Sequence, residues 1–181
     1  MSGVIERLQS GWKALRGHYW GSLAFDVLLM ILVFTLINAW QTRDLPNDEQ
    51  TPSLEPVWLD DMKAEAVMVA GKTGLVYFFA PWCFYCRHSI DNLDELLASG
   101  ELSWARAVAL EYGSVDEVRE FITETGVNMP VLLGSSQTTK DWKVRAFPTY
   151  FVINGDGQIV SRSVGYSTKA GMRARVWLNR D

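Results

Sequence analysis

The sequence predicts an α/β sandwich built around a mixed β-sheet and preceded by one transmembrane helix. Three observations predict it. The length of 181 residues allows one domain of about 120 residues plus an N-terminal appendage. From residue 74 onward, short apolar runs alternate with segments of helical periodicity, and a hairpin and a helix follow, as in sheets covered by helices. Residues 20–40 are almost wholly apolar, and about 20 such residues span a bilayer.

Residues 20–40, WGSLAFDVLLMILVFTLINAW, are expected to anchor the chain in a membrane. Trp20 and Trp40 bracket the run, as aromatic residues do at membrane interfaces. A cleaved signal peptide is the alternative, but the apolar core is too long and no Ala-x-Ala site ends it. Three basic residues precede the run, whereas only Arg43 follows closely. The positive-inside rule therefore predicts a cytoplasmic N-terminus and a C-terminal domain on the far side.

The flanks of this run divide the rest of the chain. Residues 1–19 carry apolar residues at helical spacing among basic ones, which predicts an amphipathic helix on the cytoplasmic leaflet; a short disordered tail is the alternative. Asp26 lies inside the span and is either a functional carboxylate or an interfacial one that reaches headgroup water. Residues 41–56 are polar and acidic and are expected to form a linker. Residues 57–181 are expected to form the folded domain.

The first elements of that domain are read from local patterns. Residues 57–71 are ambiguous between a helix and a hairpin. Residues 75–80 form a continuous apolar run typical of a strand buried on both faces. Residues 83–99 have the periodicity of a helix. Residues 103–111 carry apolar side chains on both parities, which favours a second doubly covered strand, although the alanines leave a helix possible.

A capping box, Ser114 with Glu117, predicts the start of the next helix. The remaining expected elements are a strand at 130–133, a helix at 138–144, two strands at 149–153 and 158–164 joined by the turn Gly155-Asp156-Gly157, and a last helix from Ser167 with Met172, Val176 and Trp177 facing inward.

The two cysteines of the chain, Cys83 and Cys86, are separated by two residues and lie at a predicted strand-to-helix turn. The unpaired N–H groups and the positive end of a helix dipole stabilise a thiolate there. Thiols at positions i and i+3 can cycle between dithiol and disulfide. A structural zinc site takes four ligands, and no second cysteine pair exists. We expect redox chemistry with no metal and no cofactor. The net charge of −4 gives no basic patch for nucleic acid.

Residues 75–87 (LVYFFAPWCFYCR) and 146–153 (AFPTYFVI) resemble the thioredoxin superfamily. The resemblance is closest to its membrane-tethered periplasmic thiol–disulfide oxidoreductases, the TlpA/ResA-like and copper-sensitivity-suppressor-like branch, and covers roughly residue 56 to the C-terminus. It implies a thioredoxin-like three-layer sandwich. Cys83, at the start of the helix, is the expected nucleophile, and Cys86, one turn deeper, is the expected resolving thiol.

Other residues are expected to support substrate binding. Trp82 is expected to shield one face of the cysteine pair, with core packing as the alternative. Phe84 and Tyr85 stand between the cysteines. The resemblance implies a cis bond between Phe147 and Pro148, which would expose the Phe147 backbone for pairing with an extended substrate. An ordinary trans proline at a strand start is the alternative.

Three departures from the superfamily pattern bear on the activity. Tyr77 stands where many thioredoxins have a buried Asp. The residues after Cys86, RHSID, lack the Glu and Pro found in cytochrome c maturation reductases. The dipeptide Phe84-Tyr85 has no His to stabilise the thiolate strongly, so a strong oxidant is not expected. The reductase or isomerase direction is favoured.

We therefore expect a single-pass protein of the bacterial inner membrane with a periplasmic catalytic domain. Its expected partners are protein thiols and disulfides and a membrane electron-transfer protein. The alternative is a non-catalytic membrane-tethered assembly module or a copper-handling module on the same fold. Copper handling on this fold typically uses a wider Cys spacing and a distant His, whereas the chain has only His18 and His88. A peroxiredoxin is disfavoured because the turn carries a Cys pair.

Overall fold

The computed structural model describes residues 19–47, 50–55, 57–59 and 66–179. The amphipathic helix expected before residue 19 lies outside the described residues. The chain divides into two compact units, 1–41 and 42–181, and each is described here by itself.

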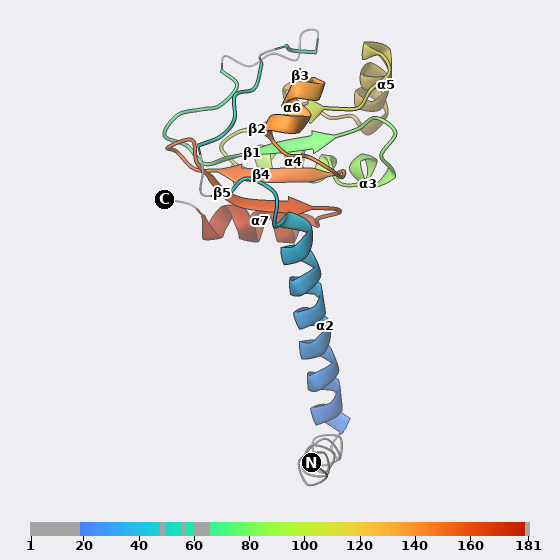
Figure 1. The fold of residues 1–181 in the computed structure, drawn as a ribbon, viewed down its shortest axis with the longest axis vertical. Helices are drawn as coiled ribbons and strands as arrows, with labels where there is room; N and C mark the ends of the chain where they lie inside the picture. The colour runs from blue at the N-terminus through green and yellow to red at the C-terminus, as the bar shows by residue number, and fades with distance from the viewer. Residues whose placement is uncertain (1–18, 48–49, 56, 60–65, 180–181) are drawn as a thin grey trace. The chain divides into compact units, whose positions relative to one another are not determined.

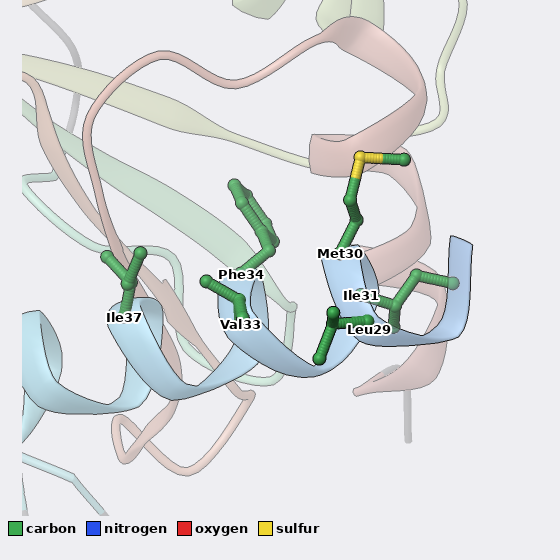
Figure 2. Close-up of a pocket in the computed structure, with 6 residues that line it drawn as sticks. All are labelled: Leu29, Met30, Ile31, Val33, Phe34 and Ile37. Carbon is green, nitrogen blue, oxygen red and sulfur yellow. The ribbon is translucent and has the colours of Figure 1, made fainter. Parts of the chain in front are cut away.

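Helix α2 (Tyr19–Thr42) covers all the described residues of the first unit and ends at Thr42, the first residue of the second unit. Its segment Leu23–Thr42 is long and apolar enough to cross a membrane. Figure 2 shows six apolar side chains projecting from successive turns of this helix: Leu29, Met30, Ile31, Val33, Phe34 and Ile37. A helix satisfies its backbone hydrogen bonds internally, which is what a chain in hydrocarbon requires.

The second unit is built on one five-stranded sheet with the order β3-β2-β1-β4-β5. β1, β2 and β3 are parallel neighbours, whereas β4 is antiparallel to both β1 and β5. The strands are β1 (Gly74–Phe79), β2 (Ala105–Ala109), β3 (Val131–Leu133), β4 (Thr149–Ile153) and β5 (Ile159–Val164). The helices are α3 (Phe84–Arg87), α4 (Asp91–Ala98), α5 (Val115–Thr125), α6 (Ser136–Asp141) and α7 (Lys169–Leu178) (Figure 1).

Both faces of the central strand β1 are buried, which explains its continuous apolar sequence. Leu75, Tyr77 and Phe79 point into one core, which also contains the inward side chains of α4, α5 and α7 and both cysteines. Val76 and Phe78 point into a second core on the opposite face. Alternate residues of a strand face opposite sides, so β1 supplies both layers. The mixed sheet between two covered faces confirms the predicted three-layer sandwich.

The second core draws on the segment expected to be a linker. Leu45 and Leu54 are buried there against Trp142, which ends α6. Residues 57–59 then run beside β3: the Leu59 N–H donates to the Val131 carbonyl, and the Leu133 N–H donates to the Val57 carbonyl. The polar composition of residues 41–56 concealed these two core leucines.

The helix expected over residues 83–99 is wrong as a single element, because it is broken into α3 and α4. The N–H groups of Ser89 and Ile90 both donate to the carbonyl of Cys86. The bond from Ile90 keeps the i to i−4 spacing, whereas the bond from Ser89 spans three residues, so the regular ladder is interrupted at Ser89. The short first piece therefore carries the cysteine pair, separate from the helix that follows.

Two smaller expectations also need correction. Trp177 is 69% exposed, whereas Met172 and Val176 are buried. Residues i and i+4 share a helix face, whereas the next residue is turned by about 100°, so Trp177 faces solvent. The helix expected from residue 138 begins at Ser136, because Ser135 caps it through the N–H and the hydroxyl of Thr138. The Ser114 cap of α5 is confirmed, with its Oγ accepting from the Glu117 N–H.

Candidate active site

The cysteine pair lies just beyond the end of β1, at the edge of the sheet to which this strand points. The Cys83 N–H donates to the Ala80 carbonyl at 3.0 Å, which closes the turn after the strand. Cys83 is the N-cap of α3, and Cys86 lies within that helix. The two residues form a disulfide with Cα atoms 5.2 Å apart. The local sequence thus delivers one cysteine to the start of the helix and the other to its inner face.

The two sulfurs have different surroundings. The Cys86 N–H donates to the Cys83 Sγ at 3.1 Å. A backbone N–H aimed at this sulfur stabilises negative charge on it once the disulfide is reduced. Cys83 keeps 5% of its surface exposed, whereas Cys86 has none. Of the two cysteines, only Cys83 therefore has surface that an incoming reactant can reach, and that surface is small.

A chain of buried hydroxyl groups lies behind the pair. The hydroxyls of Tyr77 and Ser89 are 2.7 Å apart, and the Ser89 hydroxyl donates to the Tyr85 carbonyl at 2.8 Å. A serine hydroxyl has one proton. Because Ser89 donates that proton to the Tyr85 carbonyl, Tyr77 is the donor in its hydrogen bond with Ser89. Burial raises the pKa of the Tyr77 hydroxyl well above its ordinary value, and the phenol stays neutral.

Side chains also hold the outer part of α3. The His88 Nδ1 lies 2.9 Å from the Phe84 carbonyl, and because a carbonyl only accepts, this nitrogen carries the proton. Both carbonyls of the dipeptide between the cysteines are therefore capped from residues four positions on. Ser89 was not among the residues predicted for the site, although its spacing of four from Tyr85 is a signal of such a hydrogen bond.

The positive charge of Arg87 is directed away from the sulfurs. Its guanidinium forms an ion pair with Glu124 of α5, lies 5.4 Å from the centre of the Phe121 ring, and donates to the Pro81 carbonyl at 3.3 Å. This carboxylate partner neutralises the cation. Arg87 therefore joins α3 to α5 and contributes little to the charge at Cys83.

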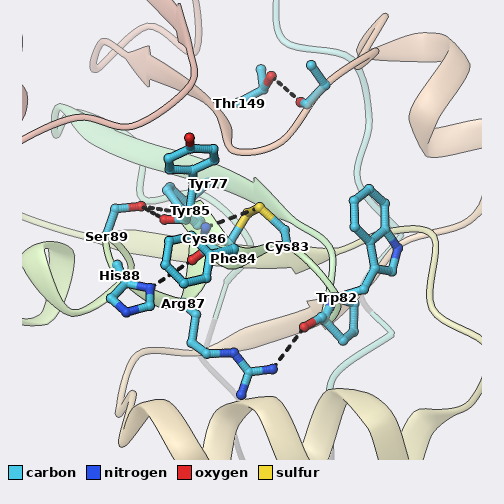
Figure 3. Close-up of a disulfide and its surroundings, with 12 residues drawn as sticks. Tyr77, Trp82, Cys83, Phe84, Tyr85, Cys86, Arg87, His88, Ser89 and Thr149 are labelled. Atoms are coloured by element: carbon cyan, nitrogen blue, oxygen red, sulfur yellow. Dashed lines mark hydrogen bonds between the residues drawn. A yellow bond between two sulfur atoms is a disulfide. The ribbon is translucent and has the colours of Figure 1, made fainter.

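Aromatic side chains flank the pair. Trp82 is 64% exposed, so the alternative of core packing is wrong. Its indole N–H donates to the Glu111 carbonyl at 3.1 Å, and its ring meets the edge of Phe147 at 5.7 Å between centroids. Phe84 and Tyr85 are 66% and 59% exposed, with centroids 5.7 Å apart. Figure 3 shows the disulfide between Trp82 on one side and the Phe84 ring on the other.

The loop before β4 approaches the cysteine turn through the contact of Trp82 with Phe147. The bond between Phe147 and Pro148 is cis, which confirms that prediction. The Pro148 carbonyl accepts from the Gly165 N–H at 2.7 Å, and the Thr149 hydroxyl donates to the Ala146 carbonyl at 2.7 Å. These bonds hold both sides of the proline in place.

Metal ligands do not gather in the part of the chain that the structure describes: no three His, Cys, Asp or Glu side chains there are grouped as a metal site.

Comparisons with known proteins agree with this geometry. The AhpC/TSA family matches residues 49–162. The thiol:disulfide interchange protein HelX of Rhodobacter capsulatus is 30% identical over 73% of this chain and 74% of its own length. The thiol-disulfide oxidoreductase ResA of Bacillus anthracis is 24% identical over 81% of this chain and 90% of its own. A thiol:disulfide interchange protein of the thioredoxin family from Chlorobium tepidum has a similar fold, with a TM-score of 0.58 and 23% identity over 74% of this chain and 95% of that one.

Proposed function

The chain belongs to the AhpC/TSA family and is a thiol–disulfide oxidoreductase, and on that premise we propose that it is a membrane-tethered periplasmic reductase or isomerase that works through Cys83 and Cys86. The observation that carries the proposal is the asymmetry of the pair. One sulfur lies at a helix start with an exposed edge, and the other is fully buried.

The proposed exchange has two steps. The Cys83 thiolate attacks one sulfur of a client disulfide, the client S–S bond breaks, a mixed disulfide forms, and the first client thiolate leaves. Cys86 then loses its proton to that thiolate or to solvent and attacks the Cys83 sulfur. The Cys83–Cys86 bond forms, and the second client thiolate leaves. Two electrons have passed to the client, and a membrane protein with a reduced dithiol is the proposed donor that restores the pair.

The direction is proposed from the charges around Cys83. Its thiolate is stabilised by the helix start and by one N–H donor. The Arg87 charge is neutralised by Glu124, and no cation stands in the Phe84-Tyr85 dipeptide. A strong oxidant requires a strongly stabilised thiolate. This site lacks the means for that, which supports reduction or isomerisation of clients.

The location is proposed from the N-terminal helix and the basic residues before it. Residues 1–19 would lie on the cytoplasmic side and 20–40 would cross the bacterial inner membrane. Residues 41–56 would connect to the periplasmic domain and contribute Leu45 and Leu54 to its second core, and 57–181 would form the rest of that domain. Apolar side chains along α2 and the charge difference across it support this arrangement. Trp82, Phe84, Tyr85, Phe147 and Pro148 are the proposed substrate contacts.

A trapping experiment tests the proposal. In bacterial cells, the full chain carrying Cys86→Ala should accumulate mixed disulfides, because the intermediate on Cys83 has no internal attacker. Non-reducing gels of the membrane fraction should show adducts of higher mass that collapse with reductant. The matched variant Cys83→Ala should form few, because its remaining thiol is buried. Equal trapping by both variants, or none by a folded and abundant Cys86→Ala protein, would contradict the assigned roles.

A further inference from the structure

We infer that the exchange site selects client cysteines flanked by apolar residues, and that Phe84 and Tyr85 provide this selectivity. The inference rests on the proposed function, because it concerns the substrate of the same site. It goes further by naming the chemistry of the client segment: an extended, uncharged and apolar stretch on either side of the reacting cysteine.

The two aromatic rings between the cysteines are exposed to solvent. Phe84 and Tyr85 are 66% and 59% exposed although both are large aromatic residues. They contact each other edge to face, and Phe84 also lies 4.4 Å from the His88 ring. Their backbone is held by the capped carbonyls of α3. The rings are therefore presented to solvent from a fixed backbone, and covering them with an apolar partner is favourable.

The Phe84 ring lies beside the reactive edge of the disulfide. The only exposed edge of the disulfide belongs to Cys83, and a client sulfur must reach that edge. Phe84 follows Cys83 directly in the sequence, and Trp82 precedes it with its ring against Phe147. Because the disulfide lies between Trp82 and the Phe84 ring (Figure 3), a client segment that reaches the Cys83 sulfur passes beside these rings. These rings are continuous with the proposed exchange site, and the client is their proposed occupant.

The surface around Cys83 has little charge to offer a client segment. The rings beside Cys83 carry no formal charge, and the nearest cation on α3, Arg87, is paired with Glu124. An acidic residue beside the client cysteine would lose hydration against the rings without gaining a partner. A membrane surface is the competing occupant of exposed aromatics. The Trp82 N–H, which would face headgroups there, already donates to the Glu111 carbonyl.

Two peptide disulfides of equal length test the inference. Each joins two copies of a seven-residue peptide through a central cysteine, flanked by Leu and Phe in one and by Ser and Gln in the other. The pre-reduced full chain in detergent is mixed with each peptide, and acid-quenched samples give the rate constants. Hydroxyethyl disulfide serves as a substrate without flanking residues.

The wild-type chain should reduce the apolar peptide about tenfold faster than the polar one, and Phe84→Ser or Tyr85→Ser should each lower that ratio about threefold. The matched control is Trp177→Ser, which removes another exposed aromatic from α7 and should leave the ratio unchanged. A wild-type ratio near one would overturn the inference. So would an unchanged ratio in the variant that carries both Phe84→Ser and Tyr85→Ser. Failure of the proposed function is distinct, because hydroxyethyl disulfide would then not be reduced.

Discussion

The Tyr77 hydroxyl is expected to stabilise the fold, whereas the Tyr150 hydroxyl beside it is expected not to. The two residues face each other across β1 and β4, with ring centroids 6.5 Å apart, and both are fully buried. Tyr77 donates to Ser89 at 2.7 Å. The Tyr150 hydroxyl has no hydrogen-bond partner among the described residues. Tyr→Phe at each position removes one oxygen atom from neighbouring, parallel rings.

The magnitudes follow from that difference. A buried hydrogen bond contributes about 1 kcal/mol net, whereas a buried polar group without a partner costs about 1–3 kcal/mol. Tyr77→Phe should therefore lower the free energy of unfolding by about 1 kcal/mol, because Ser89 keeps its bond to the Tyr85 carbonyl. Tyr150→Phe should leave that free energy unchanged or raise it by about 1 kcal/mol. The contact of the Arg175 guanidinium with the Tyr150 ring, 5.7 Å from its centre, survives the change.

Ser89→Ala extends the test to the whole hydroxyl chain. It removes the acceptor of Tyr77 and the donor to Tyr85 and leaves the Tyr77 phenol buried without a partner, so the cost should be about 2–3 kcal/mol. In that background Tyr77→Phe should reverse sign and become neutral or stabilising. Such a coupling is what a double-mutant cycle measures.

The assay is urea denaturation of the full chain in detergent, followed by tryptophan fluorescence with the disulfide intact in every variant. A 1 kcal/mol change corresponds to a shift of roughly 0.3–1 M in the urea midpoint, because m is about 1–3 kcal/mol/M for small proteins. An equal cost of Tyr77→Phe and Tyr150→Phe would refute the reasoning, because it would mean that the hydroxyl chain adds nothing beyond the loss of the oxygen atom.

Two further predictions concern packing and a loop anchor, and the same urea assay checks both. Gly74→Ala should destabilise the domain by about 2–3 kcal/mol, because an added Cβ would lie 2.0 Å from the Trp104 ring. That ring is held by its hydrogen bond to the Lys72 carbonyl. A loss of stability below about 0.5 kcal/mol would show that the ring moves freely. Asp94→Ala should cost about 2 kcal/mol of stability, because the carboxylate accepts from the N–H groups of Asn128 and Met129 before β3. Asp94→Asn keeps one acceptor oxygen and should lose only about half as much stability. Equal losses in the two variants would contradict this account.

Several features of the domain were predictable because their causes are local in the sequence. The apolar run of β1 must be buried on both faces, whichever helices cover it. The Ser114 cap depends on contacts within one turn of α5. The spacing of Cys83 and Cys86 places two thiols one turn apart. The α/β sandwich around a mixed sheet followed from the alternation of strands and helices and from the final hairpin.

Tertiary structure decided what depends on residues far apart in the chain. Leu45 and Leu54 look like parts of a polar linker until the open face of the sheet offers them a core with Trp142. Tyr77 belongs to β1 and Ser89 to the turn after α3, so their hydrogen bond, and the break of the helix near it, arise only when strand and helix pack together. Trp82 meets Phe147, which lies much further along the chain. The sequence by itself determined which residues are proposed to carry the redox chemistry, because a thiol pair needs only its spacing. Packing decided which aromatic rings remain exposed around it, because burial depends on what the rest of the chain covers.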